Sequence, residues 1–189
     1  FRDQLDRYGE LNTTALKIET AIEKSAKTKP LKLFLNTDDP LVSRIASDFN
    51  DNGIERVYYG FEEIKLAETG ENCYSPQETI NCACGRSFNY NKIFYGHLGF
   101  YECKCGIKRE SPNITAKALV DNGHSKIIIK SSETEDFEVT VNLPGLYNCY
   151  NALAAAAAAL TSGISAEDIK KGIENYSTTF GRAEFTKLM

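Results

Sequence analysis

Two pairs of cysteines constrain this chain more than any other feature of its sequence. One residue separates the cysteines of each pair and a glycine follows each pair, as in Cys82-Ala83-Cys84-Gly85 and Cys103-Lys104-Cys105-Gly106. A tight turn of this kind directs two sulfur atoms to one point, and glycine permits the positive φ that turns backbone amides towards them. The sequence therefore predicts one tetrahedral zinc site whose ligands are Cys82, Cys84, Cys103 and Cys105.

The segment between the two cysteine pairs predicts a small β-hairpin. Residues 87–101 are rich in aromatic side chains and turn formers. A unit of this size cannot bury a core of its own, so the metal has to supply folding energy. Four thiolates leave no open coordination position, and the zinc is therefore expected to be structural and not catalytic.

Three alternatives to this zinc site follow from the other cysteines and from the spacing. Two disulfides are one reading, which the intracellular character of the remaining sequence disfavours. The usual zinc ribbon has the spacing C-x-x-C, so the C-x-C pairs here make Cys73 and His97 alternative ligands. Cys149 lies in a helical segment and is interpreted as a small buried side chain.

Charge argues against nucleic-acid binding by the whole chain. The net charge is −4 and the pI about 5.3, whereas nucleic-acid binders carry a basic face. Basic residues do surround the cysteines, but two glutamates dilute them. We interpret this group as a solvated charged surface; its members are Arg86, Lys92, Lys104, Lys108 and Arg109, with Glu102 and Glu110.

Length and composition predict one domain that carries a small insertion. The chain has 189 residues, of which 42% are hydrophobic and 25% charged. No apolar run approaches the roughly 20 residues that a membrane helix needs, and the charged first residues do not form a signal peptide. These observations indicate a cytoplasmic mixed α/β protein.

The order of elements in the first third of the chain predicts an α/β fold with a mostly parallel sheet flanked by helices. A helix before Lys29-Pro30 is followed by the apolar strand 31–36, a helix over 41–49 and a strand over 54–60. Such alternation is typical of parallel sheets covered by helices. Asp38 and Asp39 are interpreted as part of a polar turn that ends the strand and caps the next helix.

Composition changes near residue 68 and again near residue 113. Residues 68–113 are predicted to form the zinc-bearing insertion, and residues 1–67 and 114–189 the main domain. Strands are expected over 116–121, 125–130 and 137–141, and a helix over 148–160. Ser165 with Asp168 predicts the start of a last amphipathic helix.

Four short motifs resemble the Mur ligase family, the ATP-dependent enzymes that join amines to carboxylates. Residues 145–155 resemble its G-x-[HYF]-N-x-x-N-x-x-A-A segment, and residues 1–9 its D-H-x-D-x-x-G region. Residues 36–40 are similar to its N-A-D-D-P turn, and residues 180–184 to its G-R-x-E motif. The resemblance implies the P-loop NTPase-like central domain of these ligases.

The cysteine insertion narrows the resemblance to the branch that amidates the D-glutamate of lipid II in peptidoglycan synthesis. It implies ATP and Mg²⁺ as further requirements, a glutaminase partner subunit, and action at the inner face of the membrane. Two alternatives stay open: a folylpolyglutamate synthase-like ligase, and a non-catalytic zinc-ribbon interaction module.

The resemblance also implies a nucleotide site. Asn148 and Asn151 are three residues apart and lie on one helical face, and a carboxamide matches the donor and acceptor of adenine N6 and N7. Tyr147 is expected to pack on the purine, and Arg182 to contact ribose or phosphate. The alternative for the two asparagines is a helix N-cap and a solvent-exposed side chain.

Two departures limit what this chain is expected to do alone. Gln4 stands where many of these ligases carry a histidine near Mg²⁺, and no G-x-x-x-x-G-K-[ST] phosphate loop occurs in the sequence. In the family that loop precedes this region and a C-terminal domain follows it. We therefore expect this chain to hold the adenine side of an ATP site and to be inactive by itself. Lys17 is interpreted as solvated.

Overall fold

The computed structural model describes residues 11–47, 53–70, 81–121 and 123–177. Its elements, in chain order, are α2 (Leu11–Ala26), β1 (Leu31–Asn36), the 3₁₀ helix η2 (Val42–Arg44), β2 (Ile54–Leu66), β3 (Asn89–Tyr95), β4 (Leu98–Glu102), β5 (Ile114–Val120), β6 (Ser125–Ser131), β7 (Phe137–Val141), α3 (Leu146–Thr161) and α4 (Ala166–Glu174).

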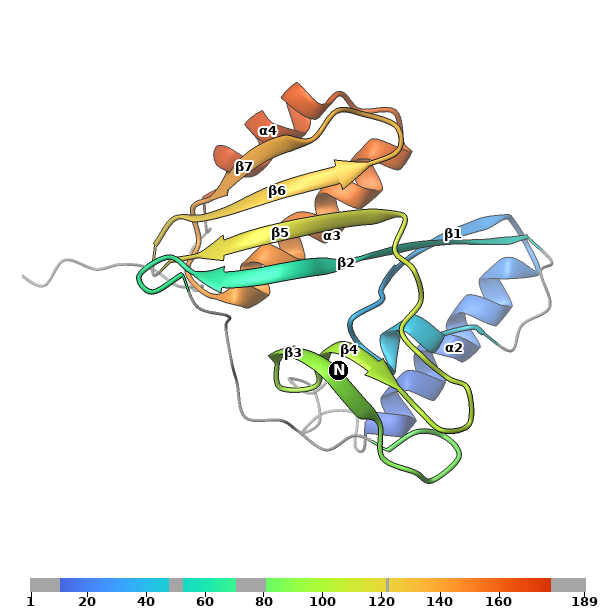
Figure 1. The fold of residues 1–189 in the computed structure, drawn as a ribbon. Helices are drawn as coiled ribbons and strands as arrows, with labels where there is room; N and C mark the ends of the chain where they lie inside the picture. Colours follow the sequence, from blue (N-terminus) through green and yellow to red (C-terminus); the bar gives the residue numbers. More distant parts are fainter. Residues whose placement is uncertain (1–10, 48–52, 71–80, 122, 178–189) are drawn as a thin grey trace, which may run out of the picture.

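Five strands form one sheet in the order β1-β2-β5-β6-β7, and β3 pairs with β4 in a separate hairpin (Figure 1). The pairs β1–β2 and β2–β5 are parallel, whereas β5–β6 and β6–β7 are antiparallel. Only four residues separate β5 from β6, which suffices for a hairpin but not for a parallel crossover. The predicted sheet flanked by helices is confirmed, with mixed pairing.

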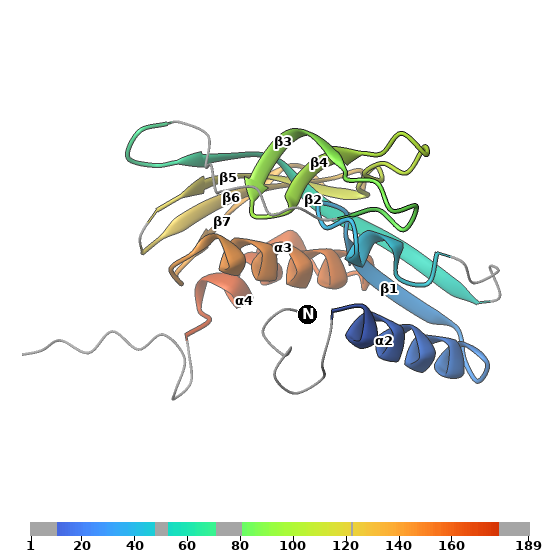
Figure 2. The ribbon, with the colours of Figure 1, turned by 90° about the horizontal axis from the view of Figure 1, so that it is seen from below.

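The helices lie on one face of this sheet, and the β3–β4 hairpin lies on the other side (Figure 2). Helix α3 crosses the sheet and contacts each of its five strands. This approach is close because the side chains that α3 buries are small: Ala152, Ala156 and Ala157 are 8% exposed or less. None of the helices in the described part of the chain could span a membrane.

The core between sheet and helices follows the two-residue period of the strands. In β6, Ile127 and Ile129 are fully buried, whereas Ile128 between them is 39% exposed. Ala116 and Ala118 of β5 and Val139 of β7 continue the same inner face. The three strands predicted between residues 116 and 141 are thereby confirmed.

One predicted element is wrong. A helix was expected over 41–49, but the structure contains only the short η2, and residues 48–52 lie outside the described part. Ile45 has extended dihedrals and Ala46 has a φ of 62°, so a helix cannot continue through them. Both side chains are buried beside Leu35 and Ile54, and the Arg56 guanidinium donates to the Ala46 carbonyl. Tertiary packing therefore overrides the local helix signal.

Strand β2 extends six residues beyond the predicted end at Gly60. Its first half pairs with β1 and its second half with β5, with an irregularity in register between Phe61 and Glu63. The final helix begins as predicted: the Ser165 hydroxyl accepts a hydrogen bond from the Asp168 amide.

Candidate functional site

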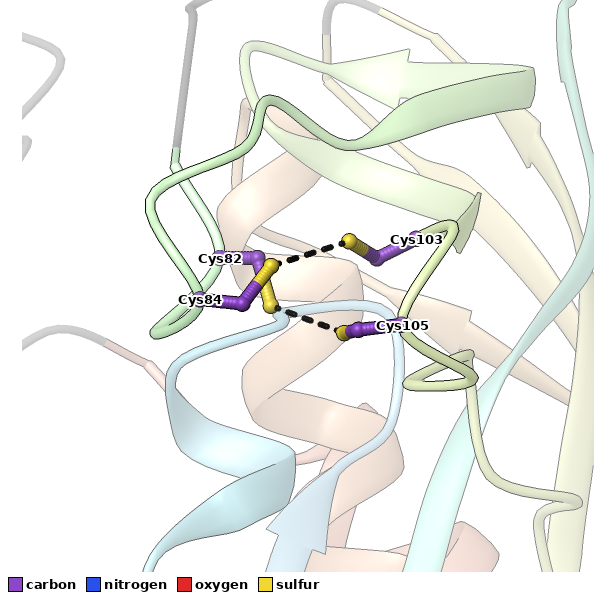
Figure 3. A group of neighbouring side chains, drawn as sticks. All are labelled: Cys82, Cys84, Cys103 and Cys105. Atoms are coloured by element: carbon purple, nitrogen blue, oxygen red, sulfur yellow. Dashed lines mark hydrogen bonds between the residues drawn. The ribbon is translucent and has the colours of Figure 1, made fainter.

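The four cysteines converge from two loops that flank the β3–β4 hairpin (Figure 3). Their sulfur atoms all lie within 4.8 Å of one another. Two sulfur–sulfur distances, Cys82 to Cys105 and Cys84 to Cys103, are each 3.6 Å. A zinc–sulfur bond of about 2.3 Å in tetrahedral geometry places sulfurs about 3.8 Å apart. The donor set therefore fits a four-coordinate zinc ion.

The turns that carry the cysteines have the backbone geometry that the sequence predicts. Gly85 and Gly106 have φ values of 82° and 97°. Each glycine amide donates to the carbonyl of the first cysteine of its pair, at 2.8 and 2.9 Å. Burial raises the pKa of the Cys82 thiol to about 12, whereas a hydrogen bond from the Ile107 amide lowers the pKa of Cys105 to about 7. Metal binding to these thiols therefore releases protons and depends on pH.

The structure bears on the disulfides and on one of the two alternative ligands. The four cysteines are free thiols at distances far longer than a disulfide bond. His97 instead contacts the Asp39 carboxylate through Nε2, at 3.1 Å. Cys73 lies outside the described residues. Cys149 is fully buried in α3, as expected, and its burial raises the pKa of its thiol to about 11.

We call residues 81–110 the cysteine ribbon. Its small core consists of Cys82, Phe88, Tyr101 and Cys103. The ribbon sits on the turn that ends β1, formed by Asn36–Pro40, which we call the 36–40 turn. Two hydrogen bonds to backbone carbonyls join them. The Gly99 amide donates to the Asp38 carbonyl at 2.9 Å, and the Thr37 hydroxyl donates to the Glu110 carbonyl at 2.6 Å.

Asp38 of this turn carries the most buried charge of the interface. Its side chain is fully buried, and Oδ1 accepts a hydrogen bond from Arg109 Nε at 2.8 Å. A terminal nitrogen of Arg109 also lies 2.8 Å from Oδ1 and completes the ion pair. Oδ2 accepts from the Phe61 amide at 2.8 Å and from the Tyr150 hydroxyl at 2.9 Å. Burial raises the pKa of this carboxyl group, and the charge of Arg109 opposes that rise.

Asp39 behaves in the opposite way to its neighbour. Burial by itself would raise its pKa, but the hydrogen bond and charge of His97 and the amides of Leu41 and Val42 outweigh burial, and the pKa is lowered. The two amides are bound by Oδ1 at 2.8 and 3.2 Å. The predicted polar turn at the end of β1 is thus present, and it also joins the ribbon to the sheet. Its predicted capping role is wrong, because the N-cap of η2 is Leu41, which makes no side-chain cap hydrogen bond.

The predicted nucleotide residues of this part of the chain lie together on the first turns of α3. Gly145 is the N-cap of this helix, so neither asparagine caps it. Asn148 is buried and donates to the Pro144 carbonyl at 2.8 Å, while Asn151 donates to the Asn148 Oδ1 at 3.3 Å. Asn151 is exposed and the Tyr147 ring is 60% exposed. The structure thus presents an exposed carboxamide, that of Asn151, hydrogen-bonded to a buried neighbour on the same helix.

Other predicted positions cannot be placed in this way. Arg182, the rest of the 180–184 motif, Gln4 and the 1–9 region lie outside the described residues. Lys17 is exposed on α2.

Two residues of the site escaped sequence reasoning. Arg109 was interpreted as part of a solvated surface, but its side chain is only 10% exposed and its guanidinium lies 4.1 Å from the Phe100 ring centroid. Tyr150 sits between the two asparagines and was assigned no role. The one available signal was the pair of adjacent aspartates after a buried strand, because a carboxylate in such a place needs a cationic partner.

Comparison with known proteins finds MurT subunits of lipid II isoglutaminyl synthase among the relatives of this chain. The chain is 35% identical over 99% of its length to the MurT subunit of the glutamine-hydrolysing lipid II isoglutaminyl synthase of Staphylococcus aureus (strain COL). It is 36% identical over 97% of its length to the MurT subunit from Streptococcus pneumoniae (strain ATCC BAA-255 / R6). The chain spans 39% of the length of each of these relatives.

Two solved structures of ligases are also similar to this chain. A pseudomurein peptide ligase type C from Methanothermus fervidus is 40% identical, with a TM-score of 0.66 over 81% of this chain and 29% of that one. A MurF from Acinetobacter baumannii is 16% identical, with a TM-score of 0.56 over 98% of this chain and 29% of that one, and it shares the fold. No protein-family model matches the chain.

Proposed function

This chain belongs to the Mur ligase family, and on that premise we propose that it is part of the ATP-dependent subunit that amidates lipid II. The observation that carries the proposal is the similarity to two MurT subunits over almost the whole chain. The proposed partner is the glutaminase subunit GatD, and the reaction takes place in the cytoplasm at the inner face of the membrane.

The proposed reaction has two steps. The γ-phosphoryl group of ATP passes to the α-carboxylate oxygen of the D-glutamate residue, which yields an acyl phosphate and ADP. Ammonia released by the glutaminase then attacks the acyl carbon, phosphate leaves, and D-isoglutamine forms. Mg²⁺ is needed to neutralise the phosphates, and the phosphate loop that holds them is expected outside this chain. The chain by itself is therefore expected to be inactive.

The proposed role of the described residues is recognition of adenine. Asn151 presents a carboxamide whose oxygen can accept from N6 and whose nitrogen can donate to N7. Asn148 holds that carboxamide in place through its Oδ1, and the exposed Tyr147 ring is available to pack against the base. We propose that Arg182 contacts ribose or phosphate.

The metal in this proposal is structural. Cys82, Cys84, Cys103 and Cys105 would hold the zinc ion, which supplies folding energy to the cysteine ribbon. We also keep as a proposal that residues 68–113 form an insertion in a central ATP-binding domain made of residues 1–67 and 114–189.

The whole protein with its glutaminase partner tests the reaction. Incubation with lipid II, glutamine and ATP is expected to convert one carboxylate of the peptide to a carboxamide, as detected by mass spectrometry. Addition of an amino acid to a folate substrate would instead identify a folylpolyglutamate synthase-like ligase. Co-purified nucleic acid without ligase activity would identify an interaction module.

Substitutions in the whole protein test the nucleotide site. Asn151→Ala is expected to weaken ATP binding about ten- to a hundredfold and to abolish the preference for ATP over GTP, because guanine O6 replaces the donor at N6. Arg182→Ala is expected to weaken both nucleotides equally. Asn89→Ala, an exposed asparagine of β3, serves as the control. Unchanged ATP affinity and preference in Asn151→Ala would contradict the assignment.

A further inference from the structure

Arg109 connects the cysteine ribbon to the interior of the main domain. Its position is set by the ribbon, because it follows the second cysteine pair by four residues and its amide donates to the Tyr101 carbonyl at 3.0 Å. Its guanidinium reaches the buried Asp38 carboxylate and the Phe61 carbonyl, the latter at 3.1 Å. Within the described residues, this is the ion pair that Asp38 makes.

Tyr150 connects the same carboxylate to α3. Its hydroxyl donates to Asp38 Oδ2 at 2.9 Å, and burial together with the nearby Asp38 charge raises the pKa of Tyr150 well above 10, so the hydroxyl stays a donor. Its ring meets the Phe61 ring edge to face at 4.8 Å. Because Tyr150 lies between Asn148 and Asn151, these contacts orient the turn that carries both asparagines.

Gly60 shows that the backbone leaves room for this arrangement. A Cβ at this position would lie 2.7 Å from Asp38 Oδ1 and 2.8 Å from a terminal nitrogen of Arg109. Both distances are shorter than van der Waals contact allows, so β2 passes directly against the ion pair. The Asp38–Arg109 ion pair thus occupies the volume that a side chain at position 60 would need.

The energetics of a buried ion pair make this connection sensitive to the ribbon. Removal of one partner leaves the other as an uncompensated buried charge, which is strongly unfavourable. If the ribbon unfolds, Arg109 withdraws, and Asp38 must take up a proton or move. Either change removes or weakens the acceptor that holds Tyr150.

We infer that Arg109 is a positioning residue that couples the folded, metal-bound ribbon through Asp38 and Tyr150 to the asparagine turn of α3. Folding of the ribbon around its metal would therefore also affect how strongly and how selectively the asparagine turn binds a nucleotide. This inference rests on the proposed function, since it concerns the same nucleotide site.

The test compares zinc-loaded and zinc-stripped forms of the whole protein. Removal of zinc by a chelator is expected to weaken ATP binding about tenfold, the loss of one hydrogen bond to a charged group, and to reduce the preference for ATP over GTP. Amide hydrogen exchange over residues 146–151 is expected to become faster. Unchanged affinity and unchanged exchange would overturn the inference.

Three variants separate coupling from general destabilisation. Tyr150→Phe keeps the ring and removes the hydroxyl, so with zinc bound it is expected to bind ATP about tenfold more weakly and to show no further loss on zinc removal. Tyr90→Phe removes a hydroxyl that donates to the His97 carbonyl inside the ribbon, and it is expected to respond to zinc removal as the unaltered protein does. Arg109→Lys is expected to retain zinc and still weaken ATP binding.

Two outcomes would contradict the inference directly. One is a Tyr150→Phe protein that responds fully to zinc removal, and the other is an Arg109→Lys protein with normal ATP affinity. If the unaltered protein binds no ATP, the proposed function fails, and hydrogen exchange over residues 146–151 alone decides the inference.

Discussion

The cysteine ribbon and the five-stranded sheet reach a folded state by different means. Among the described residues, the cluster around the sheet and its helices has twenty buried side chains, of which nineteen come from the main domain and one, Phe94, comes from the ribbon. The ribbon's own cluster has four, and two of these are Cys82 and Cys103. A cluster of four cannot offset the conformational entropy of thirty residues. The sheet therefore depends on apolar burial within its own domain. The ribbon needs further contributions, which are its packing on the sheet, its contacts with the 36–40 turn and the metal ion that its four cysteines could hold.

The two regions are nevertheless in contact. Phe94 of the β3–β4 hairpin is 1% exposed and belongs to the cluster of the sheet, and Tyr101 of the ribbon shares a hydrogen bond of 2.6 Å with Ser43. Substitutions that alter one region and leave the other intact test how far the two regions differ.

The largest effect is expected from loss of a metal ligand. Cys103→Ser is expected to abolish zinc binding and to unfold the ribbon, because zinc sites of this kind contribute about 10 kcal/mol or more to folding. Metal analysis and limited proteolysis within residues 81–110 would measure both effects. Cys149→Ala, which removes a thiol from α3, is expected to retain one zinc per chain, as is Cys73→Ser. A Cys103→Ser protein with zinc and an unchanged melting temperature would contradict the predicted site.

The next effect concerns the core of the sheet. Ile127→Ala removes a fully buried side chain and is expected to lower the free energy of unfolding by about 2–5 kcal/mol, with zinc still bound. Ile128→Ala, one residue along the same strand on the outer face, is expected to cost far less. Urea denaturation of both variants tests the difference, and equal costs would mean that the inner face of β6 is wrongly assigned.

A smaller effect is expected at the start of α4. Ser165→Ala removes the side chain that accepts from the Asp168 amide at 3.2 Å, and loss of such a cap costs about 1 kcal/mol. Thermal denaturation measures it. Lys171→Ala, an exposed position of the same helix, is the control, and a Ser165→Ala protein as stable as this control would exclude a capping role.

The smallest effect is expected from a surface ion pair on the sheet. Lys126 of β6 and Glu138 of β7 are diagonal neighbours across this strand pair. The Lys126 Nζ lies 3.0 Å from a carboxylate oxygen of Glu138, and both side chains are about half exposed. A double-mutant cycle is expected to give an interaction energy of about 0.2–1 kcal/mol that decreases with added salt. An interaction energy of several kcal/mol would show that the sheet is stabilised by surface charge as well, and would contradict its dependence on apolar burial.

Local patterns in the sequence predicted much of this protein because they act over a few residues. The spacing of Cys82, Cys84, Cys103 and Cys105 specifies two turns whatever surrounds them. The alternation in residues 125–131 specifies a strand with one buried face, and Ser165 with Asp168 specifies a helix start. Each of these depends on backbone geometry within one turn or one strand.

Sequence patterns were enough to predict the strands of the main sheet, the cysteine turns and the position of Asn148 and Asn151 on one face of a helix. The tertiary structure was needed to show that the described part of the 41–49 segment contains only η2, and that Asp38 binds both Arg109 and Tyr150. Those partners are 71 and 112 positions away from Asp38 along the chain. No local spacing encodes such contacts, because they exist only after the ribbon, β1 and α3 have packed, and burial then requires that a charge finds its partner.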